Sequence, residues 1–436
     1  TLANHFPALR TYTDTAKACA GDSADFRVNH TSEHSNLAMA ALSADPAEYS
    51  ARIAANSSIV PLMNEGLLRP MDDLVAKYGD GLQKSQLITI DGKIMGVAFM
   101  ANTQHLYYRE DILNDLGIAV PTTYEEVVAA AEKMRSTGTL LNPYAAAFKA
   151  GWNLGEEFVN MYLGHGGEFF KPGTAEPSIN NAQGVATLEM LKKLADLSNP
   201  DYLTHDSEAI KVEWESGKVG VMTLWASRSG TLLDDEGDAA ITAATKLSAP
   251  VTVAGGSIPA ATLWWDGFTL AANRPDADAE ASFRALVHAA TSKEMANNAS
   301  DQAVWLVDGF TPGPKSVGVL AAAKMGAKPY PMLPHMSLMH GALGSEIVDF
   351  FLPMEALSYK LAVISIKKAY PGQARRAAMA FWTALPQFTY TKFVVVVDEK
   401  INIRDPRQVM WVLASQVDPQ RDLFVLENTP FDSLDF

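Results

Sequence analysis

The chain has 436 residues, so a single small domain is excluded and two or three folded units are expected. Apolar residues make up 48 % of the chain and charged residues 19 %, which is ordinary for a chain that buries a core and excludes global disorder. The net charge of −15 argues against nucleic acid or an anionic membrane as a partner, because both require a basic face.

The acidic charge is unevenly distributed along the chain. Residues 346–436 carry 10 Lys and Arg against 11 Asp and Glu, a net charge of −1, so residues 1–345 carry −14. This change in composition indicates a domain boundary near residue 345.

The single cysteine, Cys19, excludes a disulfide framework and a cysteine zinc site within one chain. Its small neighbours favour a buried, inert thiol. Scarcity of cysteine suits an exported bacterial protein. The longest apolar stretches, such as 393–397, are too short for a membrane span, and no signal peptide opens the chain. We therefore expect either a cytoplasmic protein or the mature form of an exported one.

The first part of the chain alternates between strand and helix patterns. Asp91-Gly92 predicts a hairpin turn between the apolar runs 87–90 and 94–99. Thr123 and Glu126 have the spacing of a capping box at the start of a helix. Further helices are predicted over 181–197 and 276–291, and a buried strand over 219–224. The alternation favours an α/β fold with largely parallel sheets.

Two stretches rich in Gly and Pro, near 249–260 and 309–316, are typical of segments that cross between lobes. The last 91 residues have a pattern of their own. Strands are predicted over 359–366, 392–397 and 423–426, with helices over 372–385 and after Asp405-Pro406, which together form a βαβαβ unit.

Several classes of site lack their signatures. The chain has no phosphate-binding GxxxxGK[ST] loop, no GxGxxG motif, no HExxH and no GxSxG. His30 and His34 are four residues apart, but Thr31 and Ser32 between them indicate a strand-to-helix junction. A helix cap or a polar ligand contact is therefore a better interpretation than a metal site, and we expect neither a catalytic residue nor a metal.

Tryptophans near predicted strand ends and loops carry the main functional signal. They are Trp152, Trp225, Trp264, Trp265 and Trp305, and their polar neighbours are Glu156, Glu157, Arg228, Asp266 and Asp308. A flat indole stacks on the C–H face of a sugar ring, and carboxylate or guanidinium groups bind hydroxyls. The pattern indicates a neutral polyhydroxylated ligand, although Trp214 and Trp305 are equally well explained as core residues.

Residues 59–138 resemble the extracellular solute-binding proteins of bacterial sugar ABC transporters. The resemblance lies in the ordered segments NEGLLRPMDDL (64–74), DGKIMGV (91–97), LYYRED (106–111) and GIAVPTTYEE (117–126). WESGKVGVM (214–222) and WWDGF (264–268) are similar to two later strands of that family, so the resemblance covers most of 1–345.

The resemblance implies a two-lobed periplasmic-binding-protein-like α/β fold that closes on a sugar or polyol by hinge motion. Lobe 1 would comprise 1–105 with about 255–305, and lobe 2 would comprise 106–254 with about 306–345. The protein would be periplasmic or extracytoplasmic, would not be an enzyme, and would deliver its ligand to an ABC permease.

By position, the resemblance also implies which residues contact the ligand. Trp225, Trp264 and Trp265 would be stacking platforms. The polar contacts would be Asn56, Ser57, Ser58, Asn102, Gln104, His105, Arg228 and Asp266, to which the residue patterns add Trp152, Glu156 and His34.

Residues 346–436 resemble a different family, the UbiD-type decarboxylases that use prenylated flavin. The similar segments are EIVDFFLP (346–353), KKAYPGQARR (367–376), YTKFV (390–394), NIRD (402–405) and ENTP (427–430). The part of that family which carries most of the flavin pocket and the catalytic residues has no counterpart here, so we expect an inactive appendage without cofactor.

The chain therefore reads as a chimera of two ancestries. The alternative is that the tail acts as a prenylated-FMN decarboxylase or as an oligomerisation region through which the chain self-associates. Lys367 or Lys368 is either a phosphate contact or, as we favour, part of a solvated basic face.

Overall fold

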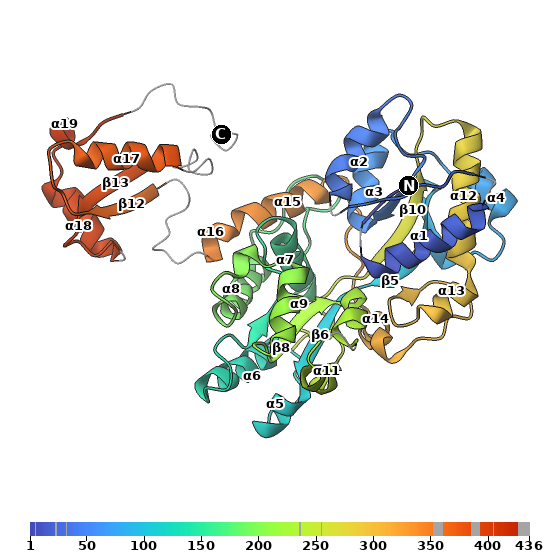
Figure 1. Ribbon diagram of the computed structural model, residues 1–436, viewed down its shortest axis with the longest axis horizontal. Helices are drawn as coiled ribbons and strands as arrows, with labels where there is room; N and C mark the ends of the chain where they lie inside the picture. The colour runs from blue at the N-terminus through green and yellow to red at the C-terminus, as the bar shows by residue number, and fades with distance from the viewer. Residues whose placement is uncertain are drawn as a thin grey trace. The chain divides into compact units, whose positions relative to one another are not determined.

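The computed structural model describes residues 1–4, 6–21, 24–31, 33–234, 237–253, 255–351, 361–384, 393–403 and 405–425. The chain divides into two compact units, Thr1–Ser345 (unit 1) and Glu346–Phe436 (unit 2), which are treated separately below. Figure 1 shows the helices and strands of both units. No helix among the described residues has the length and apolar character needed to cross a bilayer.

The larger sheet of unit 1 has the strand order β11-β5-β10-β3-β1-β2, with β4 also paired to β5. Its strands are β1 (Leu2–Ala3), β2 (Asn29–His30), β3 (Ala51–Ala55), β4 (Leu87–Ile90), β5 (Lys93–Asn102), β10 (Trp264–Leu270) and β11 (Val304–Trp305). β1 is parallel to β2 and β3, whereas β10 is antiparallel to both β3 and β5. The expectation of largely parallel sheets was therefore wrong for this sheet, because β10 returns from the other sheet and runs against its neighbours.

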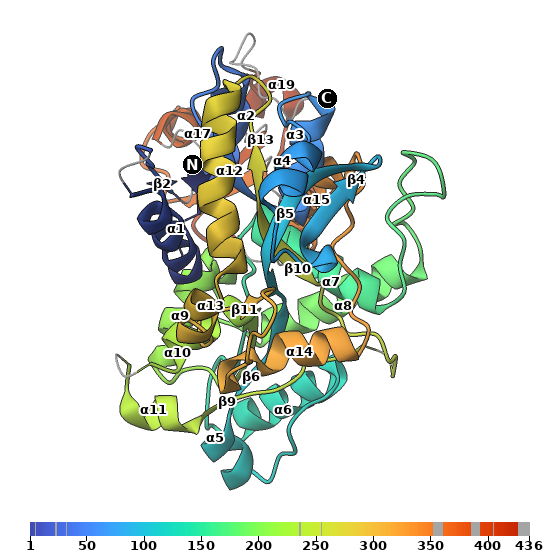
Figure 2. The same cartoon turned by 90° about the vertical axis from the view of Figure 1, so that its right-hand side faces the viewer.

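Helices cover both faces of the larger sheet. They are α1 (Pro7–Ala20), α2 (His34–Ser43), α3 (Asn56–Asn64), α4 (Asp72–Tyr78), α12 (Asp276–Thr291) and α13 (Lys293–Asn298). Figure 2 shows α1 and α12 side by side on one face, where Tyr12 stacks on Phe99 of β5 with ring centroids 3.7 Å apart. α2 and α3 bury Leu42, Ile59 and Leu62 in a separate apolar cluster.

The smaller sheet has the order β7-β8-β6-β9 and is also mixed. Its strands are β6 (Gln104–Arg109), β7 (Tyr144–Ala145), β8 (Val221–Trp225) and β9 (Thr245–Leu247). The remaining helices of unit 1 are α5 (Glu110–Asp115), α6 (Tyr124–Ser136), α7 (Trp152–Gly164), α8 (Ala182–Asp196), α9 (Ser207–Glu215), α10 (Ser229–Leu232), α11 (Ala239–Ala244), α14 (Val317–Lys324) and α15 (Met336–Glu346).

Three segments of unit 1 pass from one sheet to the other. β5 continues into β6 through Thr103, residues 248–263 join β9 to β10, and residues 306–316 join β11 to α14, which packs on β6. Two of these segments coincide with the stretches rich in Gly and Pro in the sequence. The lobe boundaries given above stay a prediction.

Local patterns in unit 1 formed largely as the sequence indicated. Asp91 and Gly92 have φ values of 51° and 75°, which the tight β4–β5 hairpin requires. The Thr123 side chain accepts the Glu126 N–H at 3.1 Å, as in a capping box. Cys19 is exposed, however, so the expectation of a buried thiol was wrong. It lies on the outer side of α1, whose inward positions are taken by larger groups such as Leu9 and Tyr12.

Unit 2 contains a parallel pair of strands, β12 (Leu361–Ile366) and β13 (Phe393–Asp398). Its helices are α16 (Val348–Phe351), α17 (Gln373–Ala384), α18 (Pro406–Gln416) and α19 (Pro419–Asp422). Asp405 caps α18 by accepting the N–H groups of Arg407 and Gln408.

The third strand expected over 423–426 is not formed in its described part, 423–425. Leu423 is 63 % and Val425 74 % exposed, because no neighbouring strand pairs with this segment among the described residues. Parts of the quoted segments, including 390–392 and 427–430, lie outside the described residues.

Candidate ligand-binding cleft

A cleft of about 470 Å³ lies between elements of the two sheets of unit 1. This volume is within the range of roughly 300–1,000 Å³ typical of small-molecule sites. Its lining comprises Asn4, Phe6, Leu9, His34, Ser35, Ile53, Ala54, Ala55, Ser57, Ser58, Asn102, Trp152, Asn153, Asp206, Ser207, Glu208, Trp225, Ser227, Arg228, Trp264 and Asp266. Most of these residues stand at the ends of strands or the first turns of helices, where side chains from distant parts of an α/β chain converge.

Three tryptophans form one continuous wall of the cleft, which we call the indole wall. Trp152 begins α7, Trp225 ends β8 and Trp264 begins β10. The Trp152 ring stacks on Trp225 with centroids 6.2 Å apart, and the Trp264 ring lies at a steep angle to both, with centroids 5.7 Å away. Trp152 is 44 % exposed and Trp264 is 6 % exposed, so the wall runs from the cleft mouth into the protein.

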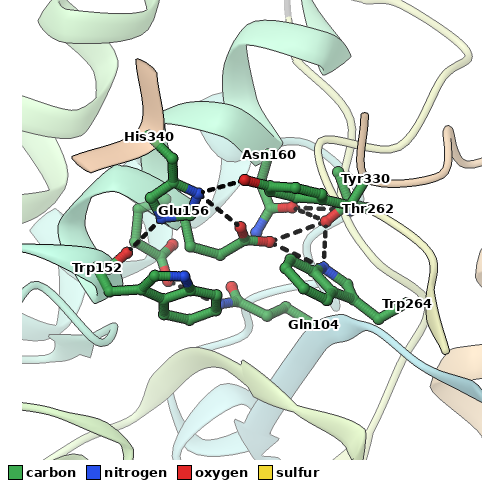
Figure 3. Close-up of polar contacts among 9 residues, drawn as sticks. Gln104, Trp152, Glu156, Asn160, Thr262, Trp264, Tyr330 and His340 are labelled. Carbon is green, nitrogen blue, oxygen red and sulfur yellow. Dashed lines mark hydrogen bonds and ion pairs between the residues drawn. The ribbon is translucent and has the colours of Figure 1, made fainter. Parts of the chain in front are cut away.

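The position of Trp152 is fixed by two residues near the end of unit 1. His340 lies 2.7 Å through Nε2 from the Trp152 carbonyl oxygen and 2.8 Å through Nδ1 from the Tyr330 hydroxyl (Figure 3). A carbonyl oxygen can only accept, so Nε2 carries the proton and Nδ1 accepts from Tyr330. Burial lowers the pKa of His340 to about 4, against the opposing bond to Trp152, and keeps the ring neutral. The imidazole also stacks on the Trp152 ring at 5.0 Å.

Trp264 is held by a buried polar cluster of Glu156 and Asn160 on α7 and Thr262 ahead of β10 (Figure 3). Its indole N–H lies 3.0 Å from Glu156 Oε1 and 2.7 Å from Thr262 Oγ1. Burial raises the pKa of Glu156 well above its usual range and so favours the neutral form of the carboxyl. Asn160 completes the cluster by accepting the Thr262 backbone N–H at 2.7 Å. The indole thus lines the cleft while its N–H group is hydrogen-bonded inside the protein.

A second buried carboxyl lies beside the first. Gln104 on β6 donates to Glu157 Oε1 at 2.8 Å, and neither side chain lines the cleft. Burial raises the pKa of Glu157 to about 8, a shift that the bond from Gln104 opposes. The pair ties the start of β6 to α7, next to one of the crossings between the sheets.

Asn102 joins the two sides of the cleft at the end of β5. Its Oδ1 accepts the Ser227 N–H at 3.2 Å, and its Nδ2 donates to the Ser227 hydroxyl at 3.2 Å. Ser227 belongs to the turn Ala226–Arg228, which follows β8. A side chain of the larger sheet therefore bonds a turn of the smaller sheet within the cleft wall.

The charged groups of the lining fall into two ion pairs and one isolated carboxylate. Asp206 accepts from Lys149 at 3.0 Å, and Glu208 pairs with Arg228 at 2.5 Å. The carboxylate of Asp266 has no hydrogen-bond or ion-pair partner within the described part of the chain, and burial alone raises its pKa to about 7.

The structure brings most of the predicted site residues to one cleft. Those that line it are His34, Ser57, Ser58, Asn102, Trp152, Trp225, Arg228, Trp264 and Asp266. Five others lie behind the lining, namely Asn56, Gln104, His105, Glu156 and Trp265.

These five residues make contacts inside the protein instead. Asn56 Oδ1 accepts the Trp265 N–H at 2.8 Å, and Trp265 packs on the apolar cluster beneath α3. His105 is 1 % exposed and stacks on Tyr107 at 4.4 Å. Gln104 and Glu156 belong to the buried bonds described above. These side chains therefore make contacts inside the protein and do not line the cleft.

Sequence reasoning missed Tyr330, His340 and Thr262, which support the indole wall, and Phe6, Asp206 and Glu208, which line the cleft. Tyr330 and His340 act only through long-range contacts, which no local pattern signals. Asp206 has a local signal, since it accepts the Glu208 and Ala209 N–H groups as the N-cap of α9. Trp214 and Trp305 are core residues, 1 % and 2 % exposed. No group of His, Cys, Asp and Glu suited to a metal ion occurs among the described residues.

The two-lobed α/β fold with an aromatic cleft at the crossings is that of a binding protein for small solutes. Residues 14–329 match the family model described as bacterial extracellular solute-binding protein. The chain therefore belongs to that family.

Solved structures share this fold. An ABC-transporter solute-binding protein from Agrobacterium radiobacter K84, in complex with ribitol, aligns with a TM-score of 0.70 at 18 % identity, over 80 % of this chain and 92 % of that chain. Maltose-bound T. maritima MalE3 aligns with a TM-score of 0.68 at 16 % identity, over 80 % and 95 %. A mannitol-bound solute-binding protein from Agrobacterium vitis S4 aligns with a TM-score of 0.63 at 14 % identity, over 80 % and 92 %.

The end of the chain is similar to other proteins. Residues 327–436 match the model of the 3-octaprenyl-4-hydroxybenzoate carboxy-lyase C-terminal domain. Over 92 residues, 21 % of this chain, the sequence is 78 % identical to the uncharacterized protein sll0936 of Synechocystis sp., and the chain spans 18 % of that relative's length. The match to the model begins before the residue 346 suggested by the sequence, whereas the spatial division falls between Ser345 and Glu346. Tyr330 and His340 thus match the second model but pack in unit 1.

The described residues of unit 2 do not fit a flavin site. Lys367 and Lys368, the candidate phosphate contacts, are exposed, as are Arg375 and Arg376 nearby. The described part of unit 2 has few buried apolar side chains that could enclose a flavin, namely Ile347, Val348, Ala378, Val397 and Val409.

Proposed function

We propose that this chain is the substrate-binding component of an ABC importer and that its cleft binds a sugar or polyol. The observation that carries the proposal is the indole wall, in which Trp152 and Trp225 from the smaller-sheet side meet Trp264 from the larger sheet. Flat apolar rings stack on the C–H faces of a sugar, while hydroxyl and amide groups at the rim exchange hydrogen bonds with its hydroxyls. Ser57, Ser58 and Asn102 supply such groups.

The ligands of the structural neighbours support this assignment of ligand class. Ribitol, maltose and mannitol are named with three of them, and all are small polyhydroxylated molecules. A ligand that touches both sides of the cleft stabilises the closed arrangement relative to an open one, which is the requirement for binding by hinge closure. In this proposal the cross-cleft bond between Asn102 and Ser227 lies close to the hinge.

The proposed place of action is the periplasm or another extracytoplasmic compartment, where the loaded protein would deliver its ligand to a membrane permease. The family description, an extracellular solute-binding protein, supports this location. For unit 2 we propose no catalytic activity, since it corresponds to 18 % of the length of its relative and its cationic side chains are exposed.

Two measurements test the proposal for unit 2. A visible absorption spectrum, taken after co-expression with a flavin-modifying enzyme, should show no flavin band, and a bound prenylated flavin would contradict the proposal. Light scattering of the full chain against a chain ending at Ser345 tests whether unit 2 mediates self-association instead. Different oligomer masses would favour that role.

Ligand titration tests the proposed binding function. Ribitol, mannitol, maltose and other mono- and disaccharides are titrated up to millimolar levels, with indole fluorescence and melting temperature as readouts. A ligand at 100 times its Kd should stabilise the native state by about 2.7 kcal/mol. If no sugar or polyol changes either signal, the proposal is wrong.

A pair of tryptophan variants shows whether the cleft is the site. Trp225→Ala removes the central ring of the indole wall and should weaken binding by roughly tenfold or more. Trp411→Ala removes an indole that is 60 % exposed in unit 2 and should leave the affinity unchanged. Equal loss of affinity in both variants would place the site elsewhere.

A further inference from the structure

The charged side chains of the cleft are unevenly paired. Of the three carboxylates in the lining, Asp206 is paired with Lys149 and Glu208 with Arg228. Asp266 has no partner among the described residues, and its backbone is fixed between β3 and β5, opposite Ala55 and Met100. A side chain on a central strand cannot swing far into solvent, so Asp266 is a carboxyl group in the cleft to which the described residues supply no counter-charge.

The unpaired carboxyl group of Asp266 is energetically unfavourable, which favours a bound cation beside it. A partly buried carboxylate without a partner is unfavourable, and a protein relieves it either by protonating the group or by supplying an opposite charge. Burial is the cause that raises the pKa of Asp266 to about 7, and no neighbouring cation opposes it. The other titratable group in the lining is His34, whose Nε2 lies 3.2 Å from the Ser35 hydroxyl.

The indole wall and Asp266 are arranged for the same group. Trp264 and Asp266 are two residues apart on β10, ahead of the irregularity between Asp266 and Gly267, and therefore project to one face of the strand. Their Cα atoms are about 6.6 Å apart at the usual rise of ~3.3 Å per residue. A cation seated between them would contact the carboxylate and the face of an indole, both of which attract positive charge.

From this juxtaposition we infer that the ligand is positively charged: a polyhydroxylated molecule that bears a protonated amine, as amino sugars do, with the ammonium group at Asp266. The inference rests on the proposed sugar or polyol function and narrows it. The hydroxyls of such a ligand use the polar rim and its ring stacks on the indole wall, while the ammonium group neutralises the carboxylate.

An anionic ligand is the main competing possibility, because several helices begin at the cleft and helix N-termini favour anions. The start of α9 is already capped by the carboxylate of Asp206. An anion would also face the unpaired carboxylate of Asp266. A neutral sugar would hydrogen-bond to Asp266 without compensating its charge. The side-chain charges therefore favour the cation.

A panel of sugars with matched scaffolds tests the inference on the intact full-length chain. The panel is titrated at pH 8 by calorimetry and by melting temperature. It consists of D-glucosamine, D-glucose, N-acetyl-D-glucosamine and D-glucuronate, together with the disaccharides built from the first three. Concentrations of the amines are corrected for the fraction that is protonated at this pH. The amine should bind roughly tenfold tighter than its neutral counterpart, the size of a desolvated ion pair or cation–π contact.

Two variants assign the preference to Asp266. Asp266→Asn removes the charge and should bring the ratio of amine to neutral affinity close to one. Asp91→Asn removes the same charge from the exposed β4–β5 turn, where Asn tolerates the φ of 51°, and should keep the ratio of the original chain.

The outcomes separate the two proposals. If a neutral sugar or the uronate binds as tightly as the amine or more tightly, the inference is overturned and the sugar-binding function stands. If the amine preference survives in Asp266→Asn, the assignment to Asp266 is overturned. If no member of the panel binds and the wider titration also fails, the proposed function itself falls, and the inference with it.

Discussion

The two units of this chain differ sharply in how well their apolar side chains are buried. Unit 1 encloses large residues such as Trp214, Trp305, Tyr12 and Phe268 at 2 % exposure or less. Among the described side chains of unit 2, the buried apolar ones are Ile347, Val348, Ala378, Val397 and Val409. Three of its larger side chains, Phe393, Met410 and Trp411, are 60 % exposed or more.

This difference shows that helices and strands can form without a packed core. Helices and strands of unit 2 form from local signals, such as the Asp405 cap and the β-branched run of β13. A packed core requires two layers of secondary structure that face each other. In the relative that is 78 % identical over 92 residues, the matching region is only 18 % of the length. The described part of unit 2 thus has helices and strands but few buried apolar side chains.

The largest expected effect comes from separating the two units. A chain of residues 1–345 should melt cooperatively at the temperature of the main transition of the full chain, because its core is complete. A chain of residues 346–436 should show no cooperative transition, since short chains with few buried residues are marginal. Differential scanning calorimetry and far-UV circular dichroism of both chains check this. A sharp transition in the 346–436 chain would break the comparison.

A matched pair of tryptophan substitutions probes the same contrast inside the full chain. Trp214 is 1 % exposed and donates its indole N–H to Thr245 Oγ1 at 2.9 Å, so Trp214→Ala should cost about 3–5 kcal/mol. Trp411 is 60 % exposed, and Trp411→Ala should change the unfolding free energy of the main transition of the full chain by no more than about 0.5 kcal/mol. Chemical denaturation provides both numbers. A comparable loss for the two substitutions would show that unit 2 has a core after all.

The sequence predicted the fold more fully than the cleft. Family-like segments and local signals such as Asp91-Gly92 and Thr123 anticipated the two-lobed fold and many of its elements, because turns and caps depend on neighbouring residues. The direction of β10 was not predictable in this way, since strand pairing is decided by contacts across the whole chain.

In the cleft, the sequence identified residues at strand ends and helix starts. It did not identify the residues that hold them in place. Trp225, Trp264 and Asp266 stand where an α/β fold exposes side chains to ligands, so position alone singled them out. His340 and Tyr330 act from a helix and a loop more than 170 residues after Trp152, and neither has a distinctive sequence context. Gln104 and His105 have the expected chemistry but are buried, because Gln104 bonds to Glu157 on α7 and His105 packs against Gly318 on α14.

A smaller effect is expected when a single hydroxyl is removed from the support of the indole wall. Tyr330→Phe deletes the donor to His340 Nδ1, 2.8 Å away, and leaves a buried ring nitrogen without a partner, at a cost of about 1–3 kcal/mol. Tyr370→Phe in unit 2 is the matched control, because Tyr370 is 43 % exposed and water replaces its bond. Denaturation curves of both variants test the pair. Equal stabilities would mean that the Tyr330–His340 bond does not support unit 1.

The smallest effect is a dependence of unit 1 stability on pH. The pKa values of Glu157 and Asp266 are raised in the folded state to about 8 and about 7, so the folded state holds protons that the unfolded state has lost. Stability from these groups therefore falls as pH rises toward 8. His105 and His340, whose pKa values are lowered to about 4, act in the opposite direction between about pH 4 and 6.5. Above pH 6.5 the histidines are neutral in both states.

Between pH 6.5 and 8, Glu157 and Asp266 therefore each contribute at most ~1.4 kcal/mol of lost stability per pH unit. Glu156, whose pKa is also raised by burial, acts in the same direction, whereas the buried α-amino group of Thr1, whose pKa burial lowers to about 6, opposes the decline. Glu157→Gln keeps an oxygen for the Gln104 donor and should flatten the decline up to pH 8. Glu132→Gln, at an exposed position of α6, should leave the slope unchanged. Unfolding free energies measured across the window decide the matter. A slope that Glu157→Gln leaves unchanged would show that water or a counter-charge reaches Glu157 in the folded state.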